Sequence, residues 1–587
     1  MFKGLRFFLQ QGWKYDKRYI LWRIIYQFVH SFIPILAALS PKYIIDELIG
    51  QKRTSVLLSY VAILVSYTLV AGIVSNCLSL DSYTRRGYVS TAFTTDLNRL
   101  LTHVDFERLE SPSFRDQKEK AEKFIFCDWH GFGYLLDMSL NVIGKCITLA
   151  GISAIILTLD LWIVTLFVIM CLVSAWAGNR AEKKAKGLTY QIVSEQRYVQ
   201  YYNNIFQDSS VGKEIRLNGL SDWITDRYAR SMQRCDATVD QRNKGYMKSN
   251  AIASGTTFIR ECAAYGYLIH AVLKGLLSIG DFTMYLNAVA AFSQALSSVM
   301  ESLAEIRLYD GYYEELETYL DLPQMLRSSG NRKVLPNAHQ LEFRKVWFRY
   351  PGQQEWALKE INITLRPGER LAVVGENGAG KTTFVKLLCR LYDPTEGQIL
   401  LDGINIKEYD YESYLSLFGT VFQDYQLFSM SLRDNVTLAL PSDDERVEKL
   451  LRQVGMGEKL DHLPKGIHTH VTRLFEEDGF EPSGGEGQKI ALARAMYRDA
   501  PIMVLDEPAA ALDPRAEYEL YRQFDHLIQD KTAVYISHRL SSARFCHQIA
   551  VFSGGRLVEY GTHQSLLKKK GLYAELFGMQ AQYYTDC

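Results

Sequence analysis

The sequence has no excess of charge of either sign and no grouped cysteines. Its 587 residues contain 66 Lys and Arg against 66 Asp and Glu, so no strong electrostatic field favours binding to nucleic acid. Nine cysteines are scattered, and no two are spaced as Cys-x-x-Cys. This spacing predicts neither a zinc site nor a disulfide framework. Residues 1–17 lack the small-residue cleavage site of a signal peptide. Their aromatic and basic side chains predict an amphipathic helix on a membrane surface instead.

Long apolar stretches fill the first half of the chain, although the mean hydropathy of the whole is only -0.10. A helix that crosses a bilayer needs about 20 apolar residues. The alternative is a set of buried helices in a soluble protein, but residues 142–178 contain only two charged residues, Lys145 and Asp160, and are too continuously apolar for that. We therefore expect six membrane-spanning helices, at 19–39, 56–76, 142–159, 161–178, 252–273 and 282–306.

The charges between these stretches predict an orientation in the membrane. Basic residues are frequent in the long segments 80–125 and 179–250, whereas the opposite connections are short. Positive segments tend to stay in the cytoplasm, so we expect the N-terminus and both long segments there, as helices that continue beyond the bilayer. Each has one break, near 111–116 and 219–223, which is either a plain hairpin tip or a short transverse helix that docks on another domain.

Several ionisable or polar side chains fall inside the expected spans. Such groups are costly at membrane depth and usually face a cavity or one another. Neighbouring residues on a helix do not face each other, so Arg260 and Glu261 have two open interpretations, substrate contact or pairing between helices. The residues concerned are Arg23, His30, Arg260, Glu261 and Glu301.

The composition changes at 322–340, which are polar, contain prolines and show no periodicity. We place a linker there, between a membrane domain at 1–321 and a second domain at 341–587. In the second domain, apolar strands alternate with helical patterns, as in an α/β fold.

A glycine-rich loop at 375–383 joins an apolar strand at 371–374 to a helix at 384–388. This G-x-x-x-x-G-K-T pattern predicts a phosphate-binding loop, because glycines let backbone N–H groups and the helix N-terminus surround an anion. Lys381 would contact the β- and γ-phosphates, and the Thr382 hydroxyl would bind Mg²⁺. A ligand-free strand-to-helix turn is the alternative, but such a turn does not require Lys-Thr after its last glycine.

Two adjacent carboxylates, Asp506 and Glu507, end the apolar strand 502–505. Burying both without a cation is expensive, and ligands bind at the carboxyl edge of α/β sheets. Asp506 would therefore hold Mg²⁺, and Glu507 would orient or deprotonate the attacking water. A surface-exposed pair is the alternative, which the apolar residues before it disfavour.

A second glycine-rich segment, 482–488, precedes a helix at 489–498. Ser483 and Glu486 match a capping box, and that local role alone explains both. The functional alternative is a second anion site at the helix N-terminus. Because the loop at 375–383 already holds its own nucleotide, such a site would cover the phosphate bound by another subunit.

The residues GENGAGKTT (375–383), SGGEGQ (483–488), VLDEP (504–508) and ISH (536–538) resemble the ATP-binding cassette of ABC transporters. Spans followed by a cassette on one chain resemble a half-size exporter of the kind that moves drugs, lipids or peptides. The resemblance implies a membrane α-helical bundle followed by an α/β P-loop ATPase, with ATP and Mg²⁺ as ligands. It also implies a second half-transporter as partner, in a homodimer or a heterodimer, within a cell membrane whose cytoplasmic side holds the ATPase.

The family roles transfer to matching positions of this sequence. Tyr350 resembles the aromatic that stacks on adenine, Gln423 the glutamine that senses Mg²⁺ and the membrane domain, and His538 the histidine that contacts the γ-phosphate. The breaks near 111–116 and 219–223 correspond to coupling helices, and Glu477 to the acid that contacts them. The remaining nucleotide-binding positions are Gly375, Asn377, Gly378, Gly380, Lys381, Thr382, Thr383, Ser483, Gly484, Gly485, Glu486 and Asp513.

Two positions depart from the family pattern. Pro482 stands where Leu is usual, and Ala509-Ala510 replaces Thr-Ser. Proline before a capping serine lies outside the helix and is tolerated, and the lost hydroxyls remove interface hydrogen bonds worth about 1 kcal/mol each. Neither change removes a catalytic group.

We therefore expect ATP-driven export of an amphipathic peptide, lipid or drug. Two alternatives stay open, a nucleotide-gated regulator or channel subunit that does not hydrolyse ATP, and one half of a heterodimeric exporter. Glu507 and His538 disfavour the first. A soluble cassette ATPase is excluded, because such a protein would not contain the long apolar spans.

Overall fold

The computed structural model comprises two compact units, one of residues Met1–Thr102 and Asp116–Leu322 and the other of His103–Arg115 and Pro323–Cys587. Each is described by itself. The residues whose structure is described are 3–111, 114, 117–118, 121, 131–159, 161–321, 326, 330–335, 339–438, 440–507, 531–537 and 540–585.

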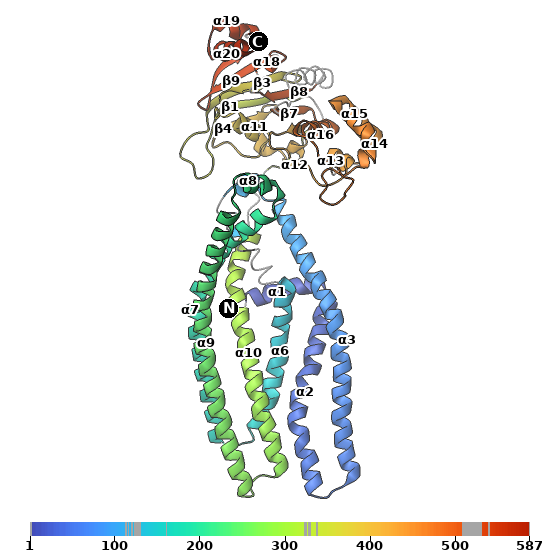
Figure 1. The fold of residues 1–587 in the computed structure, drawn as a ribbon, viewed down its shortest axis with the longest axis vertical. Helices are drawn as coiled ribbons and strands as arrows, with labels where there is room; N and C mark the ends of the chain where they lie inside the picture. The colour runs from blue at the N-terminus through green and yellow to red at the C-terminus, as the bar shows by residue number, and fades with distance from the viewer. Residues whose placement is uncertain are drawn as a thin grey trace. The chain divides into compact units, whose positions relative to one another are not determined.

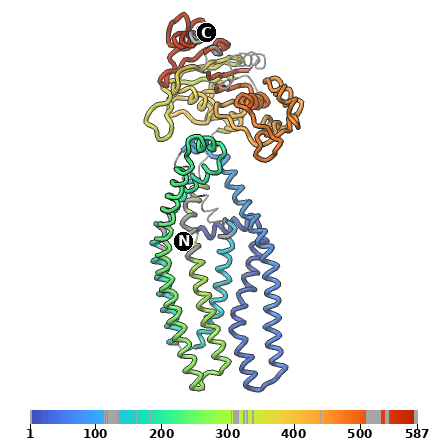
Figure 2. Tube along the Cα trace, in the orientation of Figure 1, coloured from blue at the N-terminus to red at the C-terminus, as the bar shows by residue number. Residues whose placement is uncertain are grey.

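The first unit is a bundle of long helices (Figure 1). Helix α7 packs along α9, and α2 contacts α3, α6 and α10. The α2–α3 and α9–α10 connections lie at the same end of the bundle (Figure 2), as alternating membrane crossings require. Asp16 caps the N-terminus of α2 and Ser278 that of α10. The helices are α1 (Lys3–Tyr15), α2 (Lys17–Ile49), α3 (Thr54–Leu101), α6 (Gly131–Ile156), α7 (Leu161–Gln207), η2 (Ser209–Val211), α8 (Gly212–Leu217), α9 (Ser221–Leu273) and α10 (Ile279–Leu320).

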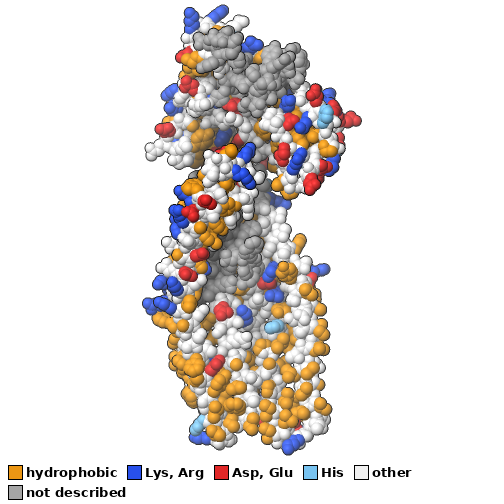
Figure 3. Space-filling view, in the orientation of Figure 1, with side chains coloured by type: hydrophobic (Ala, Val, Ile, Leu, Met, Phe, Trp, Pro, Cys, Tyr) orange, Lys and Arg blue, Asp and Glu red, His pale blue; other side chains and the backbone are white. Residues whose placement is uncertain are grey.

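Apolar side chains cover a continuous part of this unit's surface (Figure 3). Leu58, Ile63 and Leu69 of α3, for example, are each more than 60% exposed, which suits a lipid environment and not water. Within the described residues, four segments are long and apolar enough to cross a membrane: Lys17–Ile49, Thr54–Leu101, Leu135–Ile156 and Trp162–Ala185. They overlap four of the six expected spans. The other two lie on α9 and α10, which are not among the four, so the count of six stays a prediction.

The second unit contains two sheets. A four-stranded antiparallel sheet has the order β2-β1-β4-β5, and a six-stranded sheet has the order β10-β9-β3-β8-β7-β6. In the larger sheet every pairing is parallel except that of β10 with β9. Strands β7 and β8 are buried at every position, because helices cover both faces of a parallel sheet. The strands are β1 (Leu341–Phe348), β2 (Leu358–Leu365), β3 (Arg370–Gly375), β4 (Glu396–Leu401), β5 (Ile404–Asn405), β6 (Phe418–Val421), β7 (Ile502–Asp506), β8 (Thr532–Ile536), β9 (Gln548–Ser553) and β10 (Arg556–Gly561).

Helices surround these sheets and complete three apolar cores. One lies between the sheets and α11, one beneath α13, α14 and α16, and one between β3, β9 and the helices α18, α19 and α20. Helix α4, from the N-terminal half of the chain, also belongs to this unit. The helices are α4 (Phe106–Leu109), α11 (Lys381–Leu388), η3 (Ile406–Glu408), α12 (Tyr411–Leu415), α13 (Leu432–Thr437), α14 (Asp444–Leu451), η4 (Arg452–Met456), α15 (Gly457–His462), η5 (Gly466–His468), α16 (Gly484–Tyr497), α18 (Leu540–Ala543), α19 (His563–Lys569) and α20 (Leu572–Thr585).

The strand register brings the ends of four strands together. Val421 of β6 pairs with Leu505 of β7, and Asp506 pairs with Ile536 of β8, which in turn pairs with Val373 of β3. Because these strands are parallel, their carboxyl ends share one edge of the sheet. The loops that follow them carry the residues predicted to bind nucleotide.

Candidate nucleotide site

The loop between β3 and α11 requires its glycines. Gly378 and Gly380 have φ angles of 77° and 102°, which only glycine adopts readily. A Cβ on Gly375 would lie 2.2 Å from the carbonyl oxygen of Phe552. The strand, the glycine loop and the helix that the sequence predicts are all present, which is the structural context of a phosphate-binding loop.

Lys381 lies inside this loop. Its Nζ donates to the carbonyl oxygens of Gly375 and Glu376 at 2.8 and 2.9 Å, and the residue is 6% exposed. Burial lowers the pKa of the ammonium group, and the nearby carboxylates of Glu507 and Asp506 oppose that shift. The positive charge is thus held among acceptors that a phosphate can replace.

Asp506 is almost completely buried at the end of β7. Burial and the neighbouring Glu507 carboxylate raise the pKa of Asp506 from 3.8 to about 6, and the Lys381 charge and a hydrogen bond with the Thr382 side chain limit the rise. The predicted partners in metal binding, Thr382 and Asp506, are therefore in direct contact.

Glu507 begins the loop after β7 with a left-handed backbone, φ 51°. Its N–H donates to the Ile536 carbonyl at 3.0 Å, and its own carbonyl accepts from Gln488 Nε2 at 2.8 Å. Its carboxylate accepts from Gln423 Nε2 at 3.1 Å. The structure thus brings the two predicted residues Gln423 and Glu507 together, and holds Glu507 from three elements.

Hard oxygen donors suited to Mg²⁺ meet at this edge. They are the Thr382 hydroxyl, the Asp506 carboxylate and the Gln423 side-chain amide. Among the described residues, no three His, Cys, Asp or Glu side chains form a metal-binding group. Mg²⁺ usually takes one or two protein carboxylates together with substrate phosphates and water, so this donor set fits Mg²⁺ bound with a nucleotide.

The segment 483–488 forms the N-terminus of α16, and its predicted capping box is confirmed. Ser483 Oγ accepts the Glu486 N–H at 3.3 Å, and the Glu486 carboxylate accepts the Ser483 N–H at 2.8 Å. Tyr425 donates its hydroxyl to the Gly484 carbonyl at 2.9 Å.

The sequence analysis missed two residues that connect these parts. Gln488 links α16 to Glu507, and Tyr425 links the Gln423 loop to α16. Gln488 is the last residue of the predicted segment 482–488, and Tyr425 follows Gln423 by two positions, but neither position alone indicated these contacts.

Tyr350 lies beside the start of α11, with its hydroxyl 3.0 Å from Thr383 Oγ1. The Lys386 ammonium is 5.7 Å from the centre of the Tyr350 ring. Lys386 also binds the carboxylate of Glu110 at 2.9 Å, and the Tyr392 hydroxyl donates to the same carboxylate. The segment 103–111 from the first half of the chain thus packs within the cassette unit, next to the tyrosine predicted to stack on adenine.

Two arginines of the helical unit contact neighbouring helices. Arg23 of α2 lies 3.0 Å from the Asp137 carboxylate of α6. Arg260 of α9 is 1% exposed and donates to Ser293 of α10 at 2.6 Å, and its guanidinium faces the ring of Phe292. Of the two interpretations of Arg260, these contacts favour pairing between helices.

Some predicted residues lie outside the described part of the chain. They are Asp513, His538, the Ala509-Ala510 departure and most of the break at 111–116. The second break is described, and there Gly219 with φ 61° separates α8 from α9.

The fold and the site together define a multi-pass membrane protein joined to a P-loop ATPase. A family model described as ABC transporter matches residues 358–510. An ATP-dependent lipid A-core flippase of Paraburkholderia xenovorans (strain LB400) is 30% identical, over 76% of this chain and 74% of that protein. The subtilin transport ATP-binding protein of Bacillus subtilis is 27% identical, over 94% and 90% of the two chains.

Two further comparisons extend over nearly the whole chain. The nisin transport ATP-binding protein of Lactococcus lactis subsp. lactis is 26% identical over 97% of this chain and 95% of its own. The solved structure of a bacterial Atm1-family ABC exporter with ATP bound has a TM-score of 0.82 at 21% identity, and the match covers 96% of this chain and 98% of that one. It shows that the two share a fold.

The chain belongs to the ABC transporter family. It is a half-size exporter that couples ATP hydrolysis to transport across a membrane.

Proposed function

We propose that two copies of this chain form a homodimer that exports an amphipathic substrate with ATP and Mg²⁺. The observation that carries the proposal is the meeting of Lys381, Thr382–Asp506 and Gln423–Glu507 at one sheet edge, on a chain that also holds long apolar helices. In this proposal six helices cross the membrane, and the N-terminus and the ATPase unit lie in the cytoplasm.

Each role in ATP binding and hydrolysis has a candidate side chain in this site. Bound Mg²⁺ would supply positive charge that neutralises the phosphates of the nucleotide. Thr382, Asp506 and Gln423 would hold the ion, Lys381 would contact the phosphates, and Tyr350 would stack on the adenine. Glu507 would accept a proton from the attacking water, with Gln423 holding its carboxylate.

The dimer follows from the second glycine-rich segment. A helix N-terminus carries partial positive charge and attracts anions, and α16 presents Ser483, Gly484 and Gly485 there. We propose that this end of α16 covers the phosphates bound to the loop 375–383 of the other subunit, so that two ATP molecules are held at the interface. Asp513 and His538 complete each site in this proposal.

Peptides are the substrate class to test first. The relatives named for subtilin and nisin transport match more than nine tenths of this chain, whereas the lipid A-core flippase matches 76% of it. We propose that the substrate is an amphipathic peptide, with lipids and drugs as competing classes.

The test is ATP hydrolysis by the purified protein in liposomes, measured with panels of amphipathic peptides, lipids and drugs. A saturable rise in ATPase rate with peptides, together with peptide accumulation in inside-out vesicles, is the expected result. A protein that hydrolyses no ATP, or that stays monomeric with ATP and Mg²⁺, contradicts the homodimer. Activity that appears only when a second half-transporter is added would show a heterodimer.

A further inference from the structure

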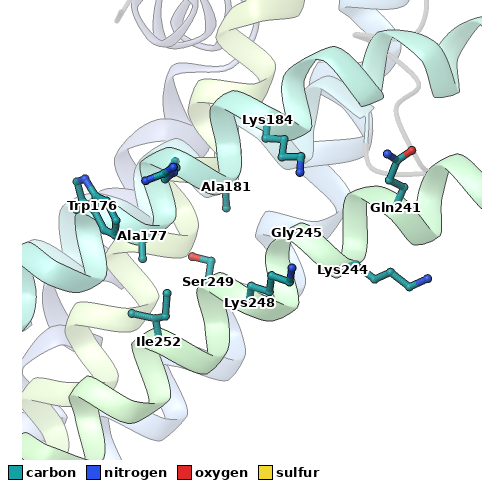
Figure 4. Close-up of a pocket in the computed structure, with 11 residues that line it drawn as sticks. Trp176, Ala177, Ala181, Lys184, Gln241, Lys244, Gly245, Lys248, Ser249 and Ile252 are labelled. Carbon is teal, nitrogen blue, oxygen red and sulfur yellow. The ribbon is translucent and has the colours of Figure 1, made fainter.

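A groove of about 410 Å³ lies between α7 and α9 of the helical unit (Figure 4). Its charged lining is entirely basic, and no Asp or Glu is among the described residues that line it. Lys184 and Lys248 point toward the space between the two helices (Figure 4). The four basic residues are Arg180, Lys184, Lys244 and Lys248.

The rest of the groove is apolar or small. Ala177 and Ala181 of α7 face Ile252 of α9. Trp176 is 58% exposed, and the Arg180 guanidinium is 5.4 Å from its ring. The groove therefore offers a phosphate-sized anion two ammonium groups and offers an acyl chain an aromatic and aliphatic wall.

Its place along the helices is the boundary of the apolar segments. The groove includes the C-terminal part of the apolar segment Trp162–Ala185, and on α9 it ends at Ile252, where the predicted span begins. Tryptophan and basic residues gather at this depth, where a bilayer changes from hydrocarbon to headgroups. In the orientation proposed above, on which this step rests, these are the headgroups of the cytoplasmic leaflet.

We propose that this groove binds the headgroup of an anionic phospholipid of the cytoplasmic leaflet. The phosphate lies between Lys184 and Lys248, and the acyl chains lie along Trp176 and Ile252. Charge complementarity favours this occupant, because four cations without a lining carboxylate would repel one another unless an anion lay between them. Basic pockets between membrane helices bind phospholipid headgroups in this manner.

The test is native mass spectrometry of the full chain in detergent, with cardiolipin, phosphatidylglycerol or phosphatidylcholine added. Tight binding of the two anionic lipids and weak binding of phosphatidylcholine is expected. One basic residue near an anionic headgroup contributes about a fivefold gain in affinity, so Lys184→Gln with Lys248→Gln should weaken anionic lipid binding about thirtyfold. The control, Lys183→Gln with Lys213→Gln, removes the same charge from exposed positions outside the groove and should bind as the parent does.

Two further arms separate the other occupants. Lys184→Arg with Lys248→Arg keeps both charges and should retain the lipid, which distinguishes loss of charge from loss of fold. Equal binding by the parent and the Lys→Gln pair, or equal loss in the control, overturns the proposal. The proposal is also overturned if the groove binds inositol hexakisphosphate in place of lipid. It is overturned as well if the Lys→Gln pair loses the dimer while lipid binding stays intact. Because the readout needs no ATP, a failure here is distinct from a failure of the proposed ATPase mechanism.

Discussion

At the scale of single residues, the nucleotide site holds one carboxyl group, that of Asp506, where burial disfavours its charge. Asp506 is 3% exposed, with Glu507 adjacent, and its pKa rises from 3.8 to about 6. A carboxyl group with a raised pKa binds its proton more tightly in the folded chain than in the unfolded one. The free energy of unfolding therefore falls as the pH rises from about 4 to about 6, and the penalty is complete above that range. Lys381 and, when it is bound, Mg²⁺ offset this penalty.

The first prediction concerns Asp506→Asn. The pKa shift of Asp506 lowers the free energy of unfolding by at most about 3 kcal/mol. A neutral amide at this position has no charge to bury and avoids this loss. Without nucleotide, the variant should unfold at a higher temperature than the parent at about pH 7.5, and at nearly the same temperature at about pH 3.5, below the unfolded pKa. Scanning calorimetry at both pH values measures this, and an equal difference at the two values would show that charge is not the cause. Stabilisation by Mg²⁺ and ATP should be lost in the variant.

The second prediction concerns Glu507→Gln. The amide can keep the contact with Gln423 but cannot accept a proton from water, so kcat should fall at least about a hundredfold while ATP affinity is retained. Steady-state ATPase rates and equilibrium nucleotide binding separate these effects. Glu445→Gln removes an exposed carboxylate of α14, outside the nucleotide site, and serves as the control. If Glu507→Gln hydrolysed ATP at the parent rate, a group other than Glu507 would have to accept the proton from the attacking water.

At the scale of elements, the N-terminus of α16 combines a structural role with a proposed binding role. Ser483 caps the helix, and this role needs no partner subunit. The proposed dimer gives the same residue a phosphate contact across the interface. The two roles can be separated, because aspartate also caps helices well but carries a negative charge.

The third prediction uses this difference. Ser483→Asp should keep the melting temperature within a few degrees of the parent and abolish ATP hydrolysis, since a carboxylate would repel the partner's bound phosphates. Ser483→Ala should lose about 1 kcal/mol of stability through the missing cap. Thermal unfolding and ATPase rates measure both. Full activity in Ser483→Asp would restrict Ser483 to the cap.

The fourth prediction concerns the segment that contains α4. Glu110 binds Lys386 and Tyr392 next to Tyr350, so this segment contacts the helix that follows the phosphate loop. Glu110→Gln should cost at most about 1 kcal/mol, because the ion pair is partly exposed. It should reduce the stimulation of ATP hydrolysis by substrate more than the basal rate. The ratio of stimulated to basal rates is the measurement, and an unchanged ratio would mean that the contact only supports the fold.

The elements also show what a single sequence can and cannot predict. The strands at 371–374 and 502–506 and the cap at Ser483 were predictable, because apolar runs, glycines and capping residues act locally. The bonds of Gln488 and Tyr425 were not, since each joins two elements that meet only after the sheet has formed. The same is true of Arg260, whose partner Ser293 lies on another helix.

At the scale of the whole molecule, the proposed homodimer holds each ATP between a loop from one chain and an α16 N-terminus from the other. Each subunit then has half of two sites. A two-fold interface of this kind is self-complementary, so defects in different halves of the site can compensate in mixed dimers.

The fifth prediction follows from this arrangement. Lys381→Ala and Ser483→Asp should each abolish ATP hydrolysis as homodimers. Mixed dimers should recover activity, because the intact loop of the Ser483→Asp subunit meets the intact α16 end of the Lys381→Ala subunit. ATPase rates of co-expressed, doubly tagged dimers measure the recovery. Inactivity of the mixture, with stable mixed dimers, would place both parts of a site on one chain.

The segment His103–Arg115 has a consequence for synthesis on the ribosome. It completes a unit whose other residues begin at Pro323, and Glu110 is 282 positions away from Tyr392. At about 5–20 residues per second, the segment waits roughly 15–55 s for its binding surface to be translated. During that time the nascent chain must keep this segment available, so ribosome pausing or chaperone binding in that interval would decide how much of the transporter matures.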